Sequence, residues 1–309
     1  MSQMSTPQIE FDEDAPLLVF GGPYSNLAAT RALIEEARRL AIPARHVICT
    51  GDVVAYCAEP EETARAIHDW GCHVVRGNCE ESLASGANDC GCNFEDGTAC
   101  DLLARGWYPF ALSRVSDELR TWMGGLPRGL SFTCGGISFR VVHGGVEETA
   151  RWVFASLGDV IAEEMESARS EVVIAGHCGL PFIARHGAGT WFNPGVIGMP
   201  ANDATPDGWY GLIEPRARGG VKLSIHRLRY DYHASAATMR RSGHANGYAR
   251  SLVTGLWPSL DVLPDEERRR TGERLKPLSV ALGAKTGGRK TPTQLSQPRD
   301  VSRRARSSP

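Results

Sequence analysis

Four apolar runs in this chain end in the same way, with a glycine beside a side chain that carries an oxygen or nitrogen donor. The donors are Asp52, Asn78, His143 and His177. Short apolar runs rich in β-branched residues predict buried strands, and the ligands of α/β proteins gather at the ends of such strands. We therefore expect these four side chains, which are far apart in the sequence, to meet at one rim of a sheet.

The segments around these runs predict an α/β fold. Residues 17–20, 46–49 and 73–75 are predicted strands separated by helices, which is the pattern of βαβ units and a mainly parallel sheet. In the second half of the chain strands dominate, and glycine-rich turns predict hairpins. The simplest architecture has two sheets packed face to face with helices outside.

Composition shifts along the chain predict its domain organisation. We expect a flexible N-terminus over residues 1–15 and one main domain over residues 16–230, with a cysteine-containing helical insert at about residues 84–125. Residues 231–275 are expected to form a helical extension that packs on the core. Residues 276–309 are rich in Gly, Ser, Pro, Lys and Arg and are predicted to be a disordered basic tail.

Charge and cysteine usage narrow the class of protein. From Arg268 onward the chain has twelve Lys and Arg and two acidic residues, a net charge of +10. Since the whole chain has a net charge of −2, residues 1–267 carry −12. A nucleic-acid contact is therefore expected only through the basic tail, where a solvated end is the alternative. No apolar stretch approaches the roughly 20 residues of a membrane helix. Nine scattered cysteines and a polar, acidic start predict a cytoplasmic protein without a disulfide framework.

The order and spacing of the donor segments resemble those of calcineurin-like metallophosphoesterases, in particular a small bacterial phosphodiesterase-like branch. The resemblance covers residues 17–228 and includes GDVVAY at residues 51–56 and FNPG at residues 192–195, both typical of that branch. It implies a four-layer αββα sandwich of two mixed β-sheets flanked by helices. It also implies a metal-dependent hydrolase of phosphate esters.

That family holds two adjacent metal ions, and the resemblance assigns the ligands position by position. One site is complete here and consists of Asp52, Asn78, His143 and His177. The other site lacks its partners, since Gly22 and Tyr24 stand in place of the Asp and His of the family's first motif. Gly179 stands in place of its last His. The resemblance thus implies a degenerate active site.

The retained ligand set predicts at least one bound divalent ion. One carboxylate, one amide oxygen and two imidazoles suit Mn²⁺, Fe²⁺ or Zn²⁺. Cys79 stands where the family has its transition-state histidine. Loss of a general acid or base typically costs about 10²–10⁴-fold in rate, so altered or weak hydrolysis is expected.

Five cysteines near the donor motifs leave two interpretations open. They are Cys79, Cys90, Cys92, Cys100 and Cys178. In the first interpretation thiolates replace the missing ligands and rebuild the metal site with sulfur. In the second they are small buried residues without a metal, which is the usual state of a free cysteine.

Three further residues have both a functional and a structural interpretation. Tyr24 either assists catalysis or fills the place of the missing ligand. Glu80 either orients a neighbouring ligand or caps the helix that begins there. Asn26 either meets a phosphate at a helix N-terminus or caps that helix.

Two functional classes follow from these observations. The first is a metal-dependent phosphoesterase-like hydrolase of phosphomonoesters or phosphodiesters, whose partner is a small-molecule phosphate ester. The second is a non-catalytic descendant that keeps its metal and responds to redox conditions through its thiols.

Overall fold

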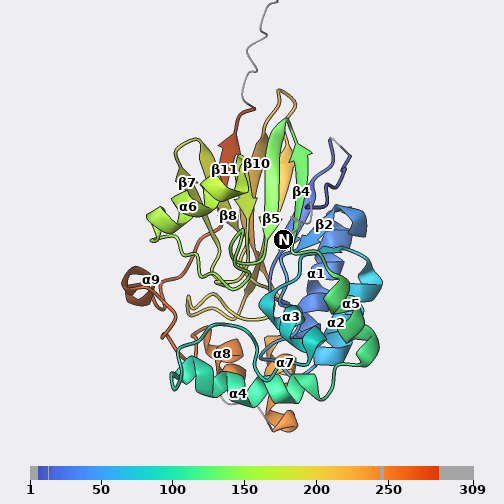
Figure 1. Ribbon diagram of the computed structural model, residues 1–309, viewed down its shortest axis with the longest axis vertical. Coiled ribbons are helices and arrows are strands. Elements are labelled where there is room, and N and C mark those ends of the chain that lie inside the picture. Colours follow the sequence, from blue (N-terminus) through green and yellow to red (C-terminus); the bar gives the residue numbers. More distant parts are fainter. Residues whose placement is uncertain (1–5, 13, 244–246, 285–309) are drawn as a thin grey trace, which may run out of the picture.

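The computed structural model of the protein describes residues 6–12, 14–243 and 247–284. Two mixed β-sheets lie face to face and helices cover their outer faces (Figure 1). The predicted α/β fold, a four-layer αββα sandwich, is confirmed.

The first sheet has six strands in the order β11-β10-β9-β1-β2-β3. Their bounds are β1 (Leu17–Phe20), β2 (Val47–Cys49), β3 (His73–Val74), β9 (Gly208–Pro215), β10 (Val221–Leu228) and β11 (Leu278–Leu282). Strands β1, β2 and β3 run parallel, as the βαβ pattern predicts, whereas β9, β10 and β11 pair antiparallel. The carboxyl ends of β2 and β3 therefore point to the same rim.

The second sheet has five strands in the order β4-β5-β6-β8-β7. Their bounds are β4 (Gly129–Cys134), β5 (Ile137–Val142), β6 (Val172–Ile174), β7 (Phe182–His186) and β8 (Gly189–Asn193). Strands β5, β6 and β8 are parallel, and antiparallel hairpin partners close both edges.

Strand β1 shows why its sequence is apolar throughout. Leu17 and Val19 belong to the core between the two sheets, whereas Leu18 and Phe20 belong to the core beneath the helices. A strand covered on both faces has no solvent side, so it loses the alternation of polar and apolar residues.

The helices form the outer layers. Helix α6 (Gly158–Ala168) packs on the second sheet, where Ile161 meets Val173 and Trp191. Figure 1 shows the helices α1, α2, α3 and α5 beside the first sheet, and α4, α7 and α8 together at one end. Their bounds are α1 (Leu27–Arg39), α2 (Pro60–Trp70), α3 (Asn78–Ser85), α4 (Ala99–Leu112), α5 (Asp117–Gly125), α7 (Tyr232–Ser242), α8 (Tyr248–Thr254) and α9 (Asp265–Arg269).

Part of the N-terminus is attached to the second sheet. Gln8 forms a parallel bridge with Ser131, and the Ile9 N–H donates a 2.8 Å hydrogen bond to the Ser131 carbonyl. Phe11 packs edge-on against Phe132 at a centroid distance of 5.1 Å. The prediction of a flexible N-terminus over residues 1–15 is therefore wrong for this stretch.

The start of the predicted tail is also structured. Strand β11 pairs with β10 and buries Leu282 in the core between the sheets. The prediction of disorder over residues 276–309 is wrong for these residues, because pairing with β10 supplies the backbone partners and the apolar contacts. Residues 285–309, with most of the basic charge predicted to contact nucleic acid, lie outside the described residues.

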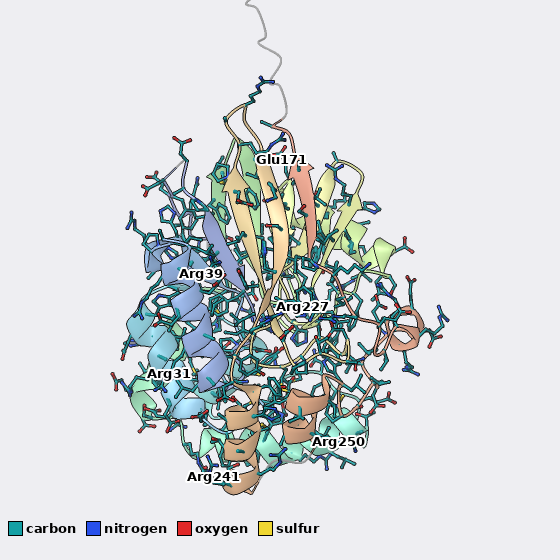
Figure 2. The ribbon with its side chains drawn as sticks, turned by 180° about the vertical axis from the view of Figure 1, so that it is seen from behind. Arg31, Arg39, Glu171, Arg227, Arg241 and Arg250 are labelled. Atoms are coloured by element: carbon teal, nitrogen blue, oxygen red, sulfur yellow. A yellow bond between two sulfur atoms is a disulfide. The ribbon has the colours of Figure 1, made fainter. Side chains whose placement is uncertain are left out.

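Arg227 fixes the segment that leads into β11. Figure 2 shows it in the middle of the molecule, whereas Arg31 and Arg39 lie along α1. Its guanidinium donates to an Asp203 carboxylate oxygen and to the Leu275 carbonyl, both at 2.6 Å. A mostly buried guanidinium with several acceptors links the two chain segments that it contacts.

Over the described part of the chain, no helix has both the length and the apolar character to cross a bilayer.

Candidate metal centre

Asp52 reaches the rim on a sharp turn after β2. Gly51 has a φ of +97°, and a Cβ placed on it would lie 2.7 Å from the Val75 carbonyl oxygen and 2.9 Å from the Nδ1 atom of His143. Only glycine fits at that position. Asp52 itself adopts a φ of 56°, a left-handed conformation that the surrounding contacts must enforce.

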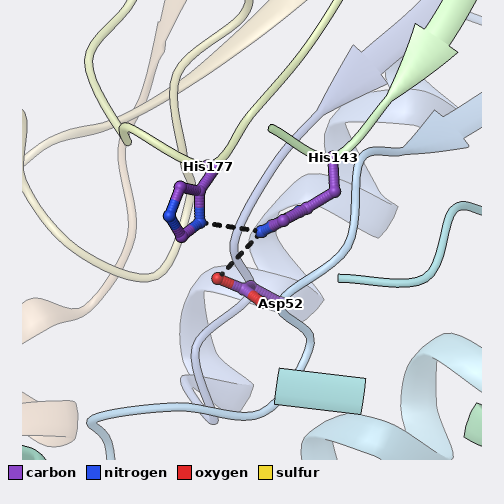
Figure 3. Close-up of side chains that lie close together, drawn as sticks. All are labelled: Asp52, His143 and His177. Carbon is purple, nitrogen blue, oxygen red and sulfur yellow. Dashed lines mark hydrogen bonds and ion pairs between the residues drawn. The ribbon is translucent and has the colours of Figure 1, made fainter. Parts of the chain in front are cut away.

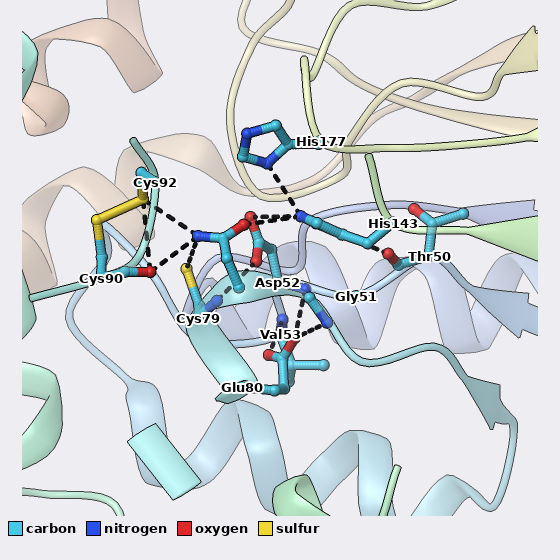
Figure 4. Close-up of polar contacts among 12 residues, drawn as sticks. Thr50, Gly51, Asp52, Val53, Cys79, Glu80, Cys90, Cys92, His143 and His177 are labelled. Carbon is cyan, nitrogen blue, oxygen red and sulfur yellow. Dashed lines mark hydrogen bonds and ion pairs between the residues drawn. A yellow bond between two sulfur atoms is a disulfide. The ribbon is translucent and has the colours of Figure 1, made fainter. Parts of the chain in front are cut away.

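Glu80 enforces that conformation. Its buried carboxylate accepts three backbone N–H groups, from Asp52 and Val53 at 2.8 Å and from Gly77 at 2.9 Å (Figure 4). Burial and the nearby Asp52 charge raise the pKa of Glu80 to about 7. Glu80 therefore clamps the Asp52 turn to the start of α3 and caps this helix at the same time.

His143 follows β5 and is oriented by the strand it faces. Its Nδ1–H donates to the Thr50 carbonyl at 2.6 Å, since a carbonyl oxygen can only accept. The Nε2 atom consequently points to the other side, into the rim. A metal-binding histidine characteristically has its second ring nitrogen held in this way.

Three ligand-type atoms surround the Nε2 atom of His143. They are the Nδ1 atom of His177 at 3.0 Å, the Asn78 Oδ1 atom at 3.1 Å and the Asp52 Oδ2 atom at 3.3 Å. Figure 3 shows that the carboxylate and the two imidazoles come from separate segments of the chain. The structure thus brings together all four residues that the strand-end pattern placed at one rim.

His177 follows β6 and is the second imidazole of the group. The backbone N–H groups of His177 and Gly176 both donate to the His143 carbonyl, at 2.9 Å and 2.8 Å. Burial and repulsion from His143 lower the pKa of His177 to about 3, so the ring is neutral. The Nε2 atom of His177 is buried without a protein partner.

Asp52 and His143 form a buried charge pair. Burial alone favours the neutral form of each, but their mutual attraction lowers the pKa of the Asp52 carboxyl and raises the pKa of the His143 imidazole. The Asn78 oxygen cannot supply a proton, and the Asp52 carboxylate in this pair is an acceptor. A protonated Nε2 atom of His143 can donate to either of these oxygens.

A divalent cation fits this arrangement. Among the described residues, Asp52, His143 and His177 form a group that could hold a metal ion together. Their ligand atoms all lie within 4.8 Å of one another. If a cation takes the place of the second His143 proton, two imidazole nitrogens, a carboxylate and an amide oxygen can all direct lone pairs at it. The donor set therefore matches a mixed N/O metal site.

Comparison with protein families identifies the superfamily of this chain. A family model described as the calcineurin-like phosphoesterase superfamily domain matches residues 24–216, more than half of the chain. The chain belongs to this superfamily. Calcineurin-like phosphoesterases depend on divalent metal ions and act on phosphate esters, and the buried Asp–His–His group is the candidate metal site of this member.

Two solved structures share the calcineurin-like phosphoesterase fold with this chain. A metallophosphoesterase from Sphaerobacter thermophilus has a TM-score of 0.62 at 20% identity, covering 78% of this chain and 99% of its own. A hypothetical protein from Pyrococcus horikoshii has a TM-score of 0.66 at 17% identity, with the same two coverages. No curated protein matches this chain.

Cysteine sulfurs lie beside the candidate metal centre of this phosphoesterase. The Asn78 Nδ2 group donates to the Cys90 carbonyl at 2.9 Å and lies 3.3 Å from the Cys92 sulfur and 3.6 Å from the Cys79 sulfur (Figure 4). These contacts fix the amide so that its oxygen faces His143. The Cys79 N–H donates weakly to the Asp52 Oδ1 atom at 3.4 Å.

Cys90 and Cys92 form a disulfide with each other. This corrects two expectations, because the sequence favoured unpaired cysteines and offered both residues as thiolate ligands. A disulfide sulfur carries no thiolate charge, so in this state neither residue is a metal ligand of that kind. Spacing alone left the pairing open, since the conformation of the loop decides it.

The remaining candidate thiols are buried outside the Asp–His–His group. Cys178 lies in a small apolar cluster and accepts a 3.2 Å contact from the Asn193 amide, and burial raises its pKa to about 12. Burial likewise raises the pKa of Cys79 and of Cys100. A raised pKa favours the neutral thiol, which is the weaker metal ligand.

The Tyr24 side chain lies against Gly22 and near Gly179. A Cβ on Gly22 would lie 2.4 Å from the Tyr24 ring, so no larger residue fits there while the ring stays. A Cβ on Gly179 would lie 3.8 Å from the Tyr24 hydroxyl. Burial is the largest cause that raises the pKa of Tyr24 well above its usual value, and the phenol is therefore neutral.

Asn26 has a structural role. Its Oδ1 atom accepts from the Ala29 N–H at 3.1 Å and from the Ser235 hydroxyl at 2.8 Å, and its amide donates to the Gly198 carbonyl at 2.9 Å. This fully buried side chain caps α1 and ties it to α7. Of the two interpretations of Asn26, these contacts support the capping function.

Sequence reasoning did not identify two neighbours of the site. The Thr50 carbonyl orients His143, and the Trp152 ring packs in a tilted arrangement against the His177 ring, with a centroid distance of 4.2 Å. A backbone carbonyl leaves no sequence signal. Trp152 follows the His143 motif closely, and an aromatic residue at that point is the signal that could have indicated it.

Proposed function

We propose that this chain is a hydrolase of phosphate esters that works with a single divalent ion, held by Asp52, Asn78, His143 and His177. The observation that carries the proposal is the convergence of three ligand-type atoms within 3.3 Å of the His143 Nε2 atom. A buried cluster of lone pairs costs free energy unless protons or a cation satisfy it. Such clusters are typical of functional sites.

A bound ion would supply Lewis acidity toward a phosphoryl oxygen and a water of lowered pKa. The chain's own residues provide the rest of the arrangement. Thr50 keeps His143 in the tautomer that presents Nε2 to the rim, and Glu80 is a positioning residue that holds the Asp52 turn. Two imidazoles with two oxygens suit Mn²⁺, Fe²⁺ or Zn²⁺.

The surroundings of Tyr24 support one ion and not two. The tyrosine ring lies over Gly22, and its hydroxyl lies 3.8 Å from the place of a Cβ on Gly179, which has no side chain of its own. Cys79, beside Asp52, is a neutral thiol with a raised pKa and is a poor proton donor at neutral pH. We therefore propose hydrolysis that is slower than that of a two-ion centre with a general acid.

The test combines metal analysis with hydrolysis of two probes, p-nitrophenyl phosphate and bis(p-nitrophenyl) phosphate, with Mn²⁺, Fe²⁺ or Zn²⁺. We expect close to one ion per chain and metal-dependent release of nitrophenolate. Asp52→Asn should weaken metal binding by more than the roughly 10–100-fold that is typical for loss of a group behind a ligand. The matched control is Asp69→Asn, an exposed aspartate on α2. Undiminished activity in Asp52→Asn would refute the site.

A second candidate function rests on the disulfide. The Cys92 sulfur lies 3.3 Å from the amide of Asn78, so reduction of the Cys90–Cys92 bond would change the surroundings of a metal ligand. In this function the chain binds its ion without turnover and senses redox conditions. Metal binding that differs severalfold between protein treated with and without dithiothreitol, together with no hydrolysis of either probe, would favour it over the hydrolase.

A further inference from the structure

An aromatic pocket adjoins the metal centre. It encloses about 550 Å³ of space, part of it open to solvent, and His177 and Tyr24 line it on the side of the centre. Much of the remaining wall consists of aromatic side chains, namely Tyr56, Phe94, Trp152, Tyr248 and Trp257.

The walls of the pocket carry no formal charge. None of its lining residues is Lys, Arg, Asp or Glu. Its polar groups are the His177 ring, the Ser259 hydroxyl, two cysteine thiols, two indole N–H groups and the phenols of three tyrosines. Burial raises the pKa of Tyr24, Tyr56 and Tyr248, so all three phenols are neutral. A phosphate group finds no countercharge here, whereas an uncharged apolar group gains free energy when it leaves water for such a pocket.

The aromatic rings are held rigidly in two sets. Tyr56 packs at 4.7 Å from Tyr24 and at 4.6 Å from Tyr248, as measured between ring centroids. On the other side, Trp152 packs at 4.2 Å from His177 and at 6.1 Å from Phe94. Rings at these separations present both faces and edges, to which another flat ring can pack.

Trp257 closes the pocket near Gly179. Its indole N–H donates to the Pro200 carbonyl at 2.7 Å, which fixes the ring. The Trp257 Cζ2 atom lies 3.6 Å from the place of a Cβ on Gly179, so any side chain there would point into the pocket. Glycine at position 179 thus keeps the space between the metal centre and Trp257 free.

We propose that this pocket binds an uncharged aromatic ring of the ester substrate, so that the chain prefers aryl esters of phosphate. This inference rests on the proposed function, because the ion at Asp52 would hold the phosphoryl group while the ring occupies the pocket. His177 belongs to both sites and sets them side by side. The pocket determines which ester is bound, and the metal centre provides the chemistry.

The test measures binding by calorimetry of two phosphonates that cannot be hydrolysed, phenylphosphonate and methylphosphonate, to the metal-loaded chain. We expect phenylphosphonate to bind about 10- to 100-fold more tightly, as burial of a ring-sized apolar surface predicts. Tyr248→Leu removes part of one wall, and Val262→Trp fills the space from a half-buried lining position. Both variants should reduce the preference severalfold and leave methylphosphonate binding unchanged. Tyr232→Leu, on the neighbouring helix α7, is the control.

The outcomes separate the two proposals. Equal affinity for the two phosphonates, or a phenyl preference that survives in both pocket variants, overturns the aromatic pocket and leaves the metal centre standing. If neither phosphonate binds, the metal centre fails, and saturable binding of phenol to the wild-type chain then decides on the pocket alone. Phenol binding that Val262→Trp removes supports the pocket, and absence of phenol binding overturns it.

Discussion

At the scale of single residues, Glu80 shows how one buried carboxylate can assemble a site without contacting its ligand atoms. It accepts three backbone N–H groups, two of them from the turn that carries Asp52. This turn is in the left-handed region at Asp52, where a non-glycine residue costs free energy. The hydrogen bonds of Glu80 offset that cost.

We expect Glu80→Gln to destabilise the protein and to weaken metal binding. An amide offers one acceptor oxygen and places an N–H₂ group against a backbone N–H, which leaves a buried donor unsatisfied at a cost of about 1–3 kcal/mol. Displacement of the Asp52 turn should lower metal affinity by roughly 10–100-fold. Chemical denaturation and metal titration measure the two effects.

The neighbouring residue gives a matched control for Glu80. Glu81 is partly exposed and forms ion pairs with Arg76 and Arg128 on the protein surface. Such pairs contribute about 0–1 kcal/mol, so Glu81→Gln should change stability little and metal affinity not at all. If the two variants behave alike, Glu80 has no positioning role.

The sequence predicted which residues would meet at the rim but not how their surroundings are built. Glycine beside a donor at the end of an apolar run is a local pattern, and it pointed to Asp52, Asn78 and His143. The pairing of Cys90 with Cys92 and the position of the Tyr24 ring over Gly22 depend on loop conformations. Those conformations arise from contacts between distant segments of the chain, and composition and motif spacing carry no information about such contacts.

At the scale of elements, strand β11 shows the same limit. Its residues follow a segment rich in charged residues, and the burial along Leu278–Leu282 is mostly partial or absent, with only the last side chain inside. Nothing local distinguishes such an edge strand from an extended tail. Its structure comes from antiparallel pairing with β10, a tertiary interaction that overrides local propensity.

Two leucines in β11 allow a test of that pairing. Leu282 is 6% exposed and belongs to the core between the sheets, whereas Leu278 is 43% exposed. We expect Leu282→Ala to cost about 2–5 kcal/mol of unfolding free energy, as for other buried leucines. Leu278→Ala should cost well under half of that in the same denaturation experiment. Equal effects of the two substitutions would show that β11 does not pack as described.

At the scale of the whole molecule, the candidate metal centre takes its residues from both sheets. Asp52 and Asn78 follow strands β2 and β3 of the six-stranded sheet, and His143 and His177 follow β5 and β6 of the five-stranded sheet. The fold was predictable at this scale because strands covered on both faces are apolar throughout and βαβ units are parallel. The convergence of the two rims is what turns four separate strand ends into one candidate site.

A site shared between two sheets couples ion binding to the stability of the whole domain. An ion that binds only the folded chain stabilises it by about 2.7 kcal/mol when its concentration is 100 times its dissociation constant. For a domain of this size, that free energy raises the melting temperature by roughly 5–10 °C. We expect Mn²⁺ or Zn²⁺ to produce such a rise in scanning calorimetry, and a chelator to reverse it.

The rise should vanish in Asp52→Asn and persist in Asp69→Asn, because Asp69 is exposed on α2 and takes no part in the centre. An equal rise in both variants would mean that the ion binds elsewhere on the chain, and that the four strand ends meet for a reason other than metal binding.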